Sequence, residues 1–250
     1  MLRIYLTGEV AVERGEHLLR DADLAGRQGR LALVYLVSER ERAVTQSELA
    51  ELLWPESLPP SWPVALSAVI SKLRQKLGSI GLDRDQIIAN AFRCYQFRPP
   101  ADAWIDLEAA ADALHEAEGA LLANQPEGAY GPALIATTIA RRPFLVGEEA
   151  SWVQTRRAKL RDVLVRALDC RVEALLWNGE LALAQDQARA AVELEPFRES
   201  GYRRLMQVLV KKGDRAEAVR VYNECRRLLA EELGVAPSTE TESLRRALTG

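Results

Sequence analysis

An internal repeat in the second half of the chain constrains its fold more than any other feature. The heptapeptide NGELALA at 178–184 aligns with KGDRAEA at 212–218, an offset of 34 residues. The residues that match at this offset are Gly179 and Gly213, Ala184 and Ala218, Leu175 and Leu209, and Leu194 and Leu228. Small residues at a fixed period allow two helices to cross closely, so each repeat is predicted to be one antiparallel helix pair.

The repeat lies within a long region of helical character. From Trp104 onward, alanine is abundant and Pro and Gly occur only as punctuation between apolar-periodic segments. A 34-residue period is typical of tetratricopeptide repeats. We therefore predict that residues 101–250 form an all-α, tetratricopeptide-like domain.

The first 100 residues have a different pattern. Residues 2–12 alternate between apolar and polar and predict a small β meander, followed by a helix over about 27–37. In TQSELAELLW, Thr45 and Glu48 are spaced as a capping box, which predicts a second helix. Ser61 is a candidate cap for a third helix, and QIIAN and CYQFR predict a terminal hairpin with its turn at 90–93. Residues 1–100 are thus predicted to form one α+β domain.

The third helix, over about 64–77, has two distinct faces. Its apolar residues fall within an arc of about 100° on a helical wheel; they are Leu66, Val69, Ile70, Leu73 and Leu77. The opposite face carries Val64, Ala68, Ser71 and Gln75, flanked by Ser67 and Arg74 on one side and by Lys72 and Lys76 on the other.

Charge is concentrated around this helix although the whole chain is slightly acidic, with a net charge of −3. No acidic residue occurs between Ser57 and Leu82. Over 57–101, six basic residues oppose Asp83 and Asp85. For the choice of partner, such a local concentration of positive charge is more informative than the net charge of the whole chain.

A small neutral strip between cations suits the DNA major groove. The backbone approaches the base pairs closely, Ser71 and Gln75 reach base edges, and the flanking cations reach the phosphates. On the wheel alone, a solvent-exposed face with a chance basic bias is an equal alternative. A capped helix, a proline-containing turn, this helix and a hairpin with Arg93 and Arg98 follow the order of a winged helix-turn-helix.

The sequence resembles a known family over nearly its whole length. The pattern TQSELAELLWPE…ALSAVISKLRQKLG…YQF is similar to the winged-helix domain of OmpR-type regulators. The segments ASWVQTRRAKLRDVLVRAL and LEPFRESGYRRLMQVLVKKGDRAEAVRVYNECRRLLAEELGVAPS resemble the bacterial transcriptional activation domain of antibiotic regulatory (SARP, AfsR/DnrI/RedD-like) activators.

The resemblance implies sequence-specific binding to double-stranded promoter DNA at direct repeats, as a homodimer, with recruitment of RNA polymerase holoenzyme. It implies a recognition helix over 63–77, a wing over 89–96 that includes Arg93, and phosphate contacts near Thr45 and Gln46. The recognition-helix residues that it places toward DNA are Ser67, Ser71, Lys72, Arg74 and Lys76. Where the family has a glycine before the wing tyrosine, Cys94 precedes Tyr95, so the resemblance leaves the wing-tip geometry open.

Other classes of function find little support in the sequence. There is no Walker A, G-x-S-x-G or H-E-x-x-H motif, and His17 and His115 lie in unrelated segments, so we expect no enzyme, cofactor or metal site. Three dispersed cysteines and the absence of a long apolar run predict a cytoplasmic protein without a membrane partner. The remaining alternative is a protein-interaction adaptor, whose repeats bind a peptide while the winged helix is degenerate.

Three smaller expectations concern side chains of the helical region. Cys170 and Cys225 are expected to be buried apolar fillers. Trp152 and Trp177 are expected in the core. The arginines that follow Trp152 are expected on a solvated helix face, in preference to an interdomain or polymerase-facing patch; they are Arg156, Arg157 and Arg161.

Overall fold

The computed structural model describes residues 1–249 and divides them into two compact units. Unit 1 comprises Met1–Ala109 and Arg142–Arg157. Unit 2 comprises Ala110–Arg141 and the chain from Ala158 onward. The domain boundary predicted at residue 100 thus falls inside unit 1, because unit 1 includes two segments that follow it in sequence.

Two small sheets form the β part of unit 1. The first has the order β3-β2-β1-β7, with β1 antiparallel to β2 and parallel to β7. Its strands are β1 (Leu2–Tyr5), β2 (Ala11–Arg14), β3 (His17–Arg20) and β7 (Trp104–Ile105). The second has the order β4-β6-β5, and its strands are β4 (Val44–Thr45), β5 (Ile88–Ala91) and β6 (Cys94–Phe97). The meander and the hairpin match the sequence prediction, whereas β7 was not predicted.

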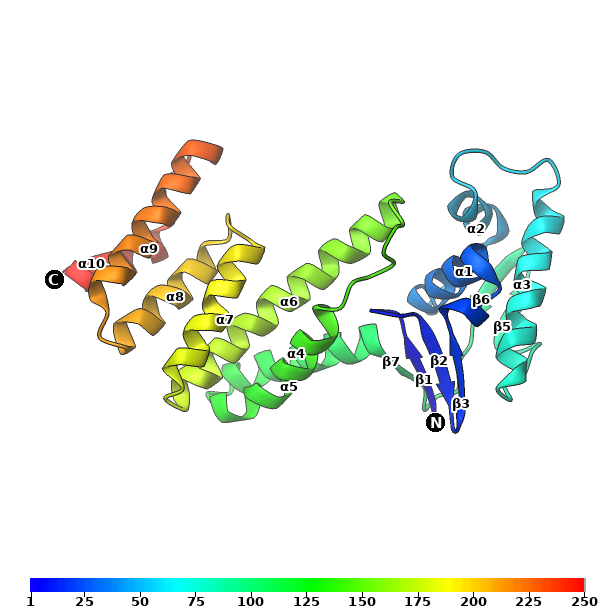
Figure 1. Ribbon diagram of the computed structural model, residues 1–250, viewed down its shortest axis with the longest axis horizontal. Helices are drawn as coiled ribbons and strands as arrows, with labels where there is room; N and C mark the ends of the chain where they lie inside the picture. Colours follow the sequence, from blue (N-terminus) through cyan, green and yellow to red (C-terminus); the bar gives the residue numbers. More distant parts are fainter. Residues whose placement is uncertain (250) are drawn as a thin grey trace. The chain divides into compact units, whose positions relative to one another are not determined.

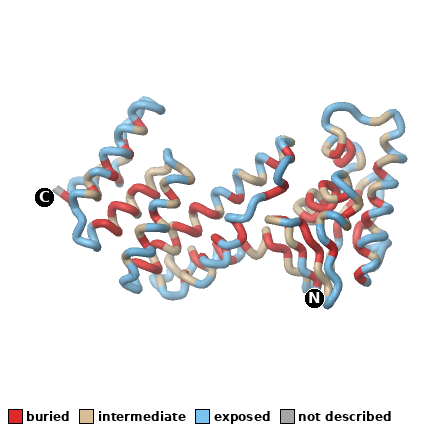
Figure 2. Tube along the Cα trace, in the orientation of Figure 1, coloured by how far each residue is buried: buried red, intermediate tan, exposed pale blue. Residues whose placement is uncertain are grey.

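Three helices pack together in unit 1 (Figure 1). They are α1 (Gly26–Ser38), α2 (Gln46–Leu53) and α3 (Trp62–Ser79), and a short 3-10 turn, η1 (Asp21–Asp23), precedes α1. The inner face of α3 is buried, as predicted, at Leu66, Ile70, Leu73 and Leu77, and Val69 is half-buried. Figure 2 shows these buried positions alternating with exposed ones along the helix. The α3 pattern therefore fixes which face of the helix is left for solvent or a partner.

The predicted helix caps are realised only in part. Thr45 Oγ1 accepts a hydrogen bond from the Glu48 amide at 3.1 Å, which confirms Thr45 as the N-cap of α2. The Glu48 carboxylate does not complete a capping box, because it accepts hydrogen bonds from Arg42 and Tyr35 instead. Ser61 occupies the N-cap position of α3 but makes no side-chain cap bond.

The segment Arg142–Arg157 is tied to the helices of unit 1 by polar and aromatic contacts. Glu148, whose side chain is 5% exposed, pairs with Arg27 at 2.5 Å and Arg30 at 3.0 Å. Trp152 packs edge-on against Tyr35, with ring centroids 5.2 Å apart. Arg156 donates to the Ser38 carbonyl at 3.0 Å. These contacts explain why a segment that is distant in sequence belongs to unit 1.

The solvated helix face expected for Arg156 and Arg157 was therefore a wrong prediction. Arg157 donates to the Phe144 and Leu145 carbonyls at 3.0 and 2.7 Å. Both guanidiniums satisfy backbone oxygens, a role that no helical periodicity reveals. Arg161 behaves as expected, since its side chain is 60% exposed and its distance to Glu195 is 3.9 Å.

Unit 2 consists of helices in the described part of the chain. They are α4 (Asp106–Leu122) from Ala110 onward, α5 (Pro126–Ala140), α6 (Ser151–Trp177) from Ala158 onward, α7 (Leu181–Leu194), α8 (Glu199–Lys211), α9 (Arg215–Leu228), the π-helical turn η2 (Leu229–Leu233) and α10 (Thr239–Thr249). Consecutive helices α7, α8 and α9 pack side by side (Figure 1). Within residues 1–249, no helix combines the length and apolar character that crossing a membrane requires.

The 34-residue repeat has the same backbone structure in both copies. Gly179 and Gly213 both have positive φ, at 76° and 84°. The next amide donates to an equivalent carbonyl at 2.9 Å in each, Glu180 to Leu175 and Asp214 to Leu209. This αL turn ends one helix and starts the next, and only glycine adopts it without strain. Ala184 and Ala218 are both fully buried at the helix contacts, as the repeat predicted.

The cysteines of unit 2 match their prediction, but one tryptophan does not. Cys170 and Cys225 are buried, and burial raises the pKa of each thiol to about 11. Trp177 was expected in the core and is instead 65% exposed, so that prediction was wrong. It is the last residue of α6, where the apolar face of the helix ends.

Candidate nucleic-acid interface

The outward face of α3 carries the predicted contact residues together. Ser67, Ser71, Lys72, Gln75 and Lys76 are all exposed. Val64, at the start of this face, is 71% exposed. The structure therefore places five of the predicted residues on one continuous helix surface with small neutral side chains at its centre.

The cations of this face lack internal partners. Most arginines of unit 1 pair with carboxylates, as Arg40 does with Glu108 and Arg42 with Glu48. Within residues 1–249, by contrast, Lys72 and Lys76 form no ion pair and no side-chain hydrogen bond. Their charge is left for an external anion, and such a face gains free energy from phosphate contacts.

Arg74 has a different environment from the two lysines. Its guanidinium is partly buried and donates from Nε to the Ile88 carbonyl of β5 at 3.1 Å. This bond joins α3 to the β5–β6 hairpin. The structure thus gives Arg74 a positioning contact, because one edge of its guanidinium is directed at the hairpin.

The N-terminus of α2 lies beside the same hairpin. β4 pairs with β6, with Thr45 opposite Cys94, and the Gln46 amide donates to the Arg93 carbonyl at 2.9 Å. Of the first three helix amides, those of Gln46 and Glu48 are thus already bonded, and Ser47 between them is an exposed residue. Thr45, Gln46 and Arg93 therefore lie close together.

Glu48 places a negative charge in the first turn of α2. Its pKa is lowered, chiefly by hydrogen bonds from Arg42 and also by the Tyr35 hydroxyl. Burial and the Glu48 hydrogen bond in turn raise the pKa of Tyr35 to about 12. The carboxylate is therefore neutralised within unit 1 by Arg42 and does not face the α3 cations as a free charge.

The tip of the β5–β6 hairpin is a two-residue turn. Ala91 pairs with Cys94, and the two residues between them, Phe92 and Arg93, have φ of 51° and 60°. Positive φ at both central positions is the pattern of a type I′ turn, which normally selects Asn-Gly. Cys94 lies in β6, so the missing family glycine does not disturb the turn; the strained positions are the two before it.

Phe92 is the exposed residue that sequence reasoning missed. With 99% of its surface exposed, it is the most exposed large hydrophobic residue within residues 1–249. The apolar pattern of the hairpin indicated a strand or turn residue there and gave no signal of outward orientation. Only the two-residue turn, which follows from the register of β5 and β6, directs it away from the protein.

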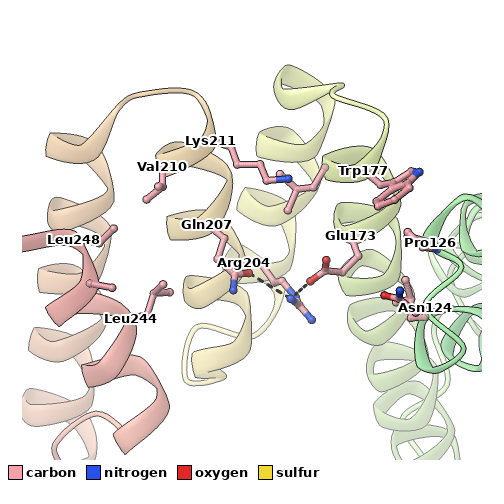
Figure 3. Close-up of a pocket in the computed structure, with 13 residues that line it drawn as sticks. Asn124, Pro126, Glu173, Trp177, Arg204, Gln207, Val210, Lys211, Leu244 and Leu248 are labelled. Carbon is pink, nitrogen blue, oxygen red and sulfur yellow. Dashed lines mark hydrogen bonds and ion pairs between the residues drawn. The ribbon is translucent and has the colours of Figure 1, made fainter.

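A second candidate site is a groove in unit 2 with a volume of about 700 Å³ (Figure 3). Leu244 and Leu248 of α10 and Val210 of α8 form an apolar wall. Arg204 pairs with Glu173 at its floor. Trp177 and Lys211 lie at its rim, and Lys211 has no ion pair with any residue of 1–249. The groove is thus concave, with an apolar wall and a few polar groups.

Comparisons with known proteins show what this chain is similar to. Residues 105–249 match the bacterial transcriptional activator domain. The regulatory protein AfsR of Streptomyces coelicolor is 30% identical over 221 residues, which are 88% of this chain and 22% of AfsR. The transcriptional regulatory protein EmbR of Mycobacterium tuberculosis is 25% identical over 216 residues, 86% of this chain and 55% of EmbR.

A solved structure of Mycobacterium tuberculosis EmbR, in complex with a low affinity phosphopeptide, has the same fold. It superposes with a TM-score of 0.90 at 23% identity and covers 99% of this chain and 65% of that one. The chain thus spans about a fifth of AfsR and about half of EmbR. The chain belongs to the family of the bacterial transcriptional activator domain, among the AfsR/DnrI/RedD-like (SARP) transcriptional activators.

Proposed function

We propose that this chain binds promoter DNA in a sequence-specific manner through α3 and activates transcription by recruiting RNA polymerase holoenzyme. The observation that carries the proposal is the α3 face, where a small neutral strip lies between Lys72 and Lys76 on one side and Ser67 on the other. Its dimensions and charge suit the major groove. The family membership supports a regulator of transcription.

In this proposal the polar residues of α3 have separate tasks. Ser71 and Gln75 contact base edges, and Lys72 and Lys76 contact the phosphates on one wall of the groove. Ser67 and the N-terminus of α2, with Thr45 and the Ser47 amide, contact phosphate on the other side. Arg93 reaches phosphate from the hairpin.

The first experiment measures salt dependence. Sites are selected from a random duplex pool, and affinity for the selected duplex is measured by fluorescence anisotropy over a range of salt concentrations. The double variant Lys72→Ala, Lys76→Ala is expected to reduce the slope of log K against log salt by about two, because each phosphate contact contributes about 0.9. The variant Lys159→Ala, Lys212→Ala is the matched control, since it removes two lysines elsewhere.

Arg74 provides a second, sharper comparison. Because its guanidinium bonds to Ile88, Arg74→Ala is expected to weaken binding while leaving the salt slope nearly unchanged. A slope reduced by about one would instead assign Arg74 to a phosphate. Undetectable duplex affinity at low salt, for the unaltered chain, would overturn the proposed function.

Dimerisation and polymerase recruitment are tested on the selected site. We infer a homodimer on direct repeats, so changing the half-site spacing by five base pairs, about half a helical turn, is expected to abolish cooperative binding. Run-off transcription with purified holoenzyme is expected to rise when the chain is added to a template carrying the site. A template with the site scrambled is the control.

The groove of unit 2 favours one alternative function, a peptide-binding adaptor. Exposed Trp177 and unpaired Lys211 at the rim of an apolar groove are the observation in its support. If duplex binding fails while Trp177→Ala abolishes capture of a peptide ligand selected by display, the adaptor function replaces the DNA-binding one.

A further inference from the structure

The sequence at the hairpin tip is poorly suited to its backbone. Asn-Gly is the usual pair for a turn with two positive φ values, whereas this chain has Phe92 and Arg93 there. A bulky aromatic residue in the left-handed region is uncommon. Strain of this kind persists where the surrounding structure imposes it, and it concentrates at functional positions.

Packing within the protein does not explain the aromatic side chain. Phe92 is 99% exposed, and no aromatic or cation–π contact joins it to another residue of the described chain. Its neighbours at the tip are Ala91 and Arg93, both exposed, and the Arg93 side chain has no ion pair within 1–249. The tip therefore presents one aromatic ring beside one unpaired cation.

The tip is held in a fixed position relative to the α3 face. The Gln46 amide bonds to the Arg93 carbonyl at 2.9 Å, and β6 pairs with β4 directly before α2. Arg74 of α3 bonds to Ile88 at the base of the hairpin. Because three elements are joined in this way, a partner that engages α3 meets Phe92 at a defined place.

The chemistry of the tip favours a nucleic-acid groove over a protein surface. A single ring without a surrounding apolar patch is too small to anchor a protein–protein interface. A narrow groove with phosphate walls and a floor of base pairs, by contrast, matches one cation and one flat apolar group. The minor groove of DNA has these features, and apolar side chains inserted there unstack a base step.

Resting on the proposed function, we propose that Phe92 inserts into the minor groove beside the site of α3 and partly unstacks one base step. Arg93 contacts the adjacent phosphate. The chain thereby gains sequence preference at a position that α3 does not touch, because pyrimidine–purine steps unstack most easily. Phe92 is then a specificity-determining residue.

The deciding variant is Phe92→Asn, because asparagine suits positive φ and lacks the apolar ring. Its melting temperature is expected to rise, while its affinity for the selected duplex falls by about tenfold, in line with loss of one base–aromatic contact. Phe92→Leu, which keeps an apolar wedge, is expected to bind within about threefold of the unaltered chain. Opposite signs for stability and affinity exclude misfolding as the cause.

Two further measurements locate the contact. Placing 2-aminopurine at successive positions beside the α3 footprint is expected to give one position whose fluorescence rises with the unaltered chain and not with Phe92→Asn. Replacing a TA step by AA at that position is expected to weaken duplex binding by the unaltered chain and to leave binding by Phe92→Asn unchanged. Arg93→Ala is expected to lower the salt slope by about one and to leave the fluorescence rise intact.

The outcomes separate this inference from the proposed function. If the unaltered chain binds its duplex and Phe92→Asn binds equally well with no fluorescence difference, the insertion is overturned and α3-mediated binding stands. A second outcome also overturns the insertion. If Phe92→Asn weakens self-association on DNA but leaves the affinity for a single half-site unchanged, Phe92 contacts a second copy of the chain.

Discussion

The two units of this chain are stabilised at very different sequence separations. In unit 1, the buried carboxylate of Asp106 accepts hydrogen bonds from the amides of Leu6 and Thr7, about 100 residues away, at 2.9–3.0 Å. Glu148 pairs with Arg27 and Arg30 across more than 110 residues. In unit 2, consecutive helices such as α7, α8 and α9 pack on each other and repeat the same turn.

This difference predicts two kinds of response to mutation. Contacts between distant segments form together or not at all. Unit 1 is therefore expected to lose much of its stability when a substitution removes one of these long-range contacts. Stacked helix pairs contribute more nearly additively, so unit 2 is expected to respond in graded steps. Four tests, each with a control or counterpart substitution, probe the comparison, from the largest expected effect to the smallest.

Gly29→Ala is expected to have the largest effect. A Cβ atom at this position of α1 lies 1.9 Å from the Leu24 carbonyl oxygen and 2.9 Å from Ala25 Cβ. The backbone oxygen cannot move without displacing η1 and the start of α1. A loss of about 3 kcal/mol or more in the free energy of unfolding is expected, measured by urea denaturation.

The matched control lies in unit 2. Gly119 is an exposed helical residue of α4, and a Cβ atom there meets nothing within 4 Å. Gly119→Ala is expected to raise stability by up to about 1 kcal/mol, because alanine loses less backbone entropy in a helix. Equal effects of the two substitutions would contradict the packing at Gly29.

Glu148→Ala is expected to have the second-largest effect. The substitution removes the nearly buried carboxylate that pairs with both Arg27 and Arg30. Removing one member of a buried pair is costly, and we expect a loss of about 2–3 kcal/mol, reduced because Arg27 is half exposed. Glu149→Ala is the control, since that side chain is 76% exposed, and it is expected to change stability by less than about 0.5 kcal/mol.

Ala184→Leu and Ala218→Leu test whether the two copies of the repeat in unit 2 are equivalent. Each alanine is fully buried at a helix contact, and the two occupy equivalent positions of the repeat. The larger leucine side chain overpacks the contact, so each variant is expected to lose about 1–3 kcal/mol in the free energy of unfolding. Ala182→Leu, at an exposed position of α7, is the control. Equal losses in the free energy of unfolding would indicate that the two copies of the repeat pack equivalently. A far larger loss for one variant would show that its copy contributes more to the stability of unit 2.

Much of the local structure was predictable because its cause is local. The spacing of Leu66, Ile70, Leu73 and Leu77 identifies the buried face of α3 without reference to the rest of the chain. A capping threonine marks the start of α2, and the glycines of the repeat mark its turns. For the same reason, the exposed face of α3 was defined together with its buried one.

The features that the sequence did not reveal depend on distant partners. Strand β7 has only two residues, and its pairing with β1 joins residues 101 positions apart. Segment 142–157 carries no periodic signal for its contacts with α1. The outward direction of Phe92 depends on a hairpin register, and one residue of slip would change it.

Glu48→Gln is expected to have the smallest effect and a distinctive pH dependence. The folded pKa of Glu48 lies below its unfolded value, mainly because Arg42 donates to the carboxylate. Its contribution is therefore present above the unfolded pKa of about 4.3 and is lost as pH falls through the folded pKa. Since Arg42 is 45% exposed, we expect Glu48→Gln to cost about 0.5–1 kcal/mol at pH 7.

Melting temperatures of the unaltered chain and of Glu48→Gln, compared at pH 7 and pH 3, measure this effect. The difference between them is expected to shrink at the lower pH, because the contribution of Glu48 is lost as pH falls through its lowered folded pKa. Glu199→Gln in unit 2 is the counterpart. Burial raises the Glu199 pKa, but hydrogen bonds from Thr241 and Ser238 outweigh burial and lower it. The same sign in both units would show that short-range electrostatics are alike where long-range packing differs, and a difference that is independent of pH would contradict the Arg42 contact.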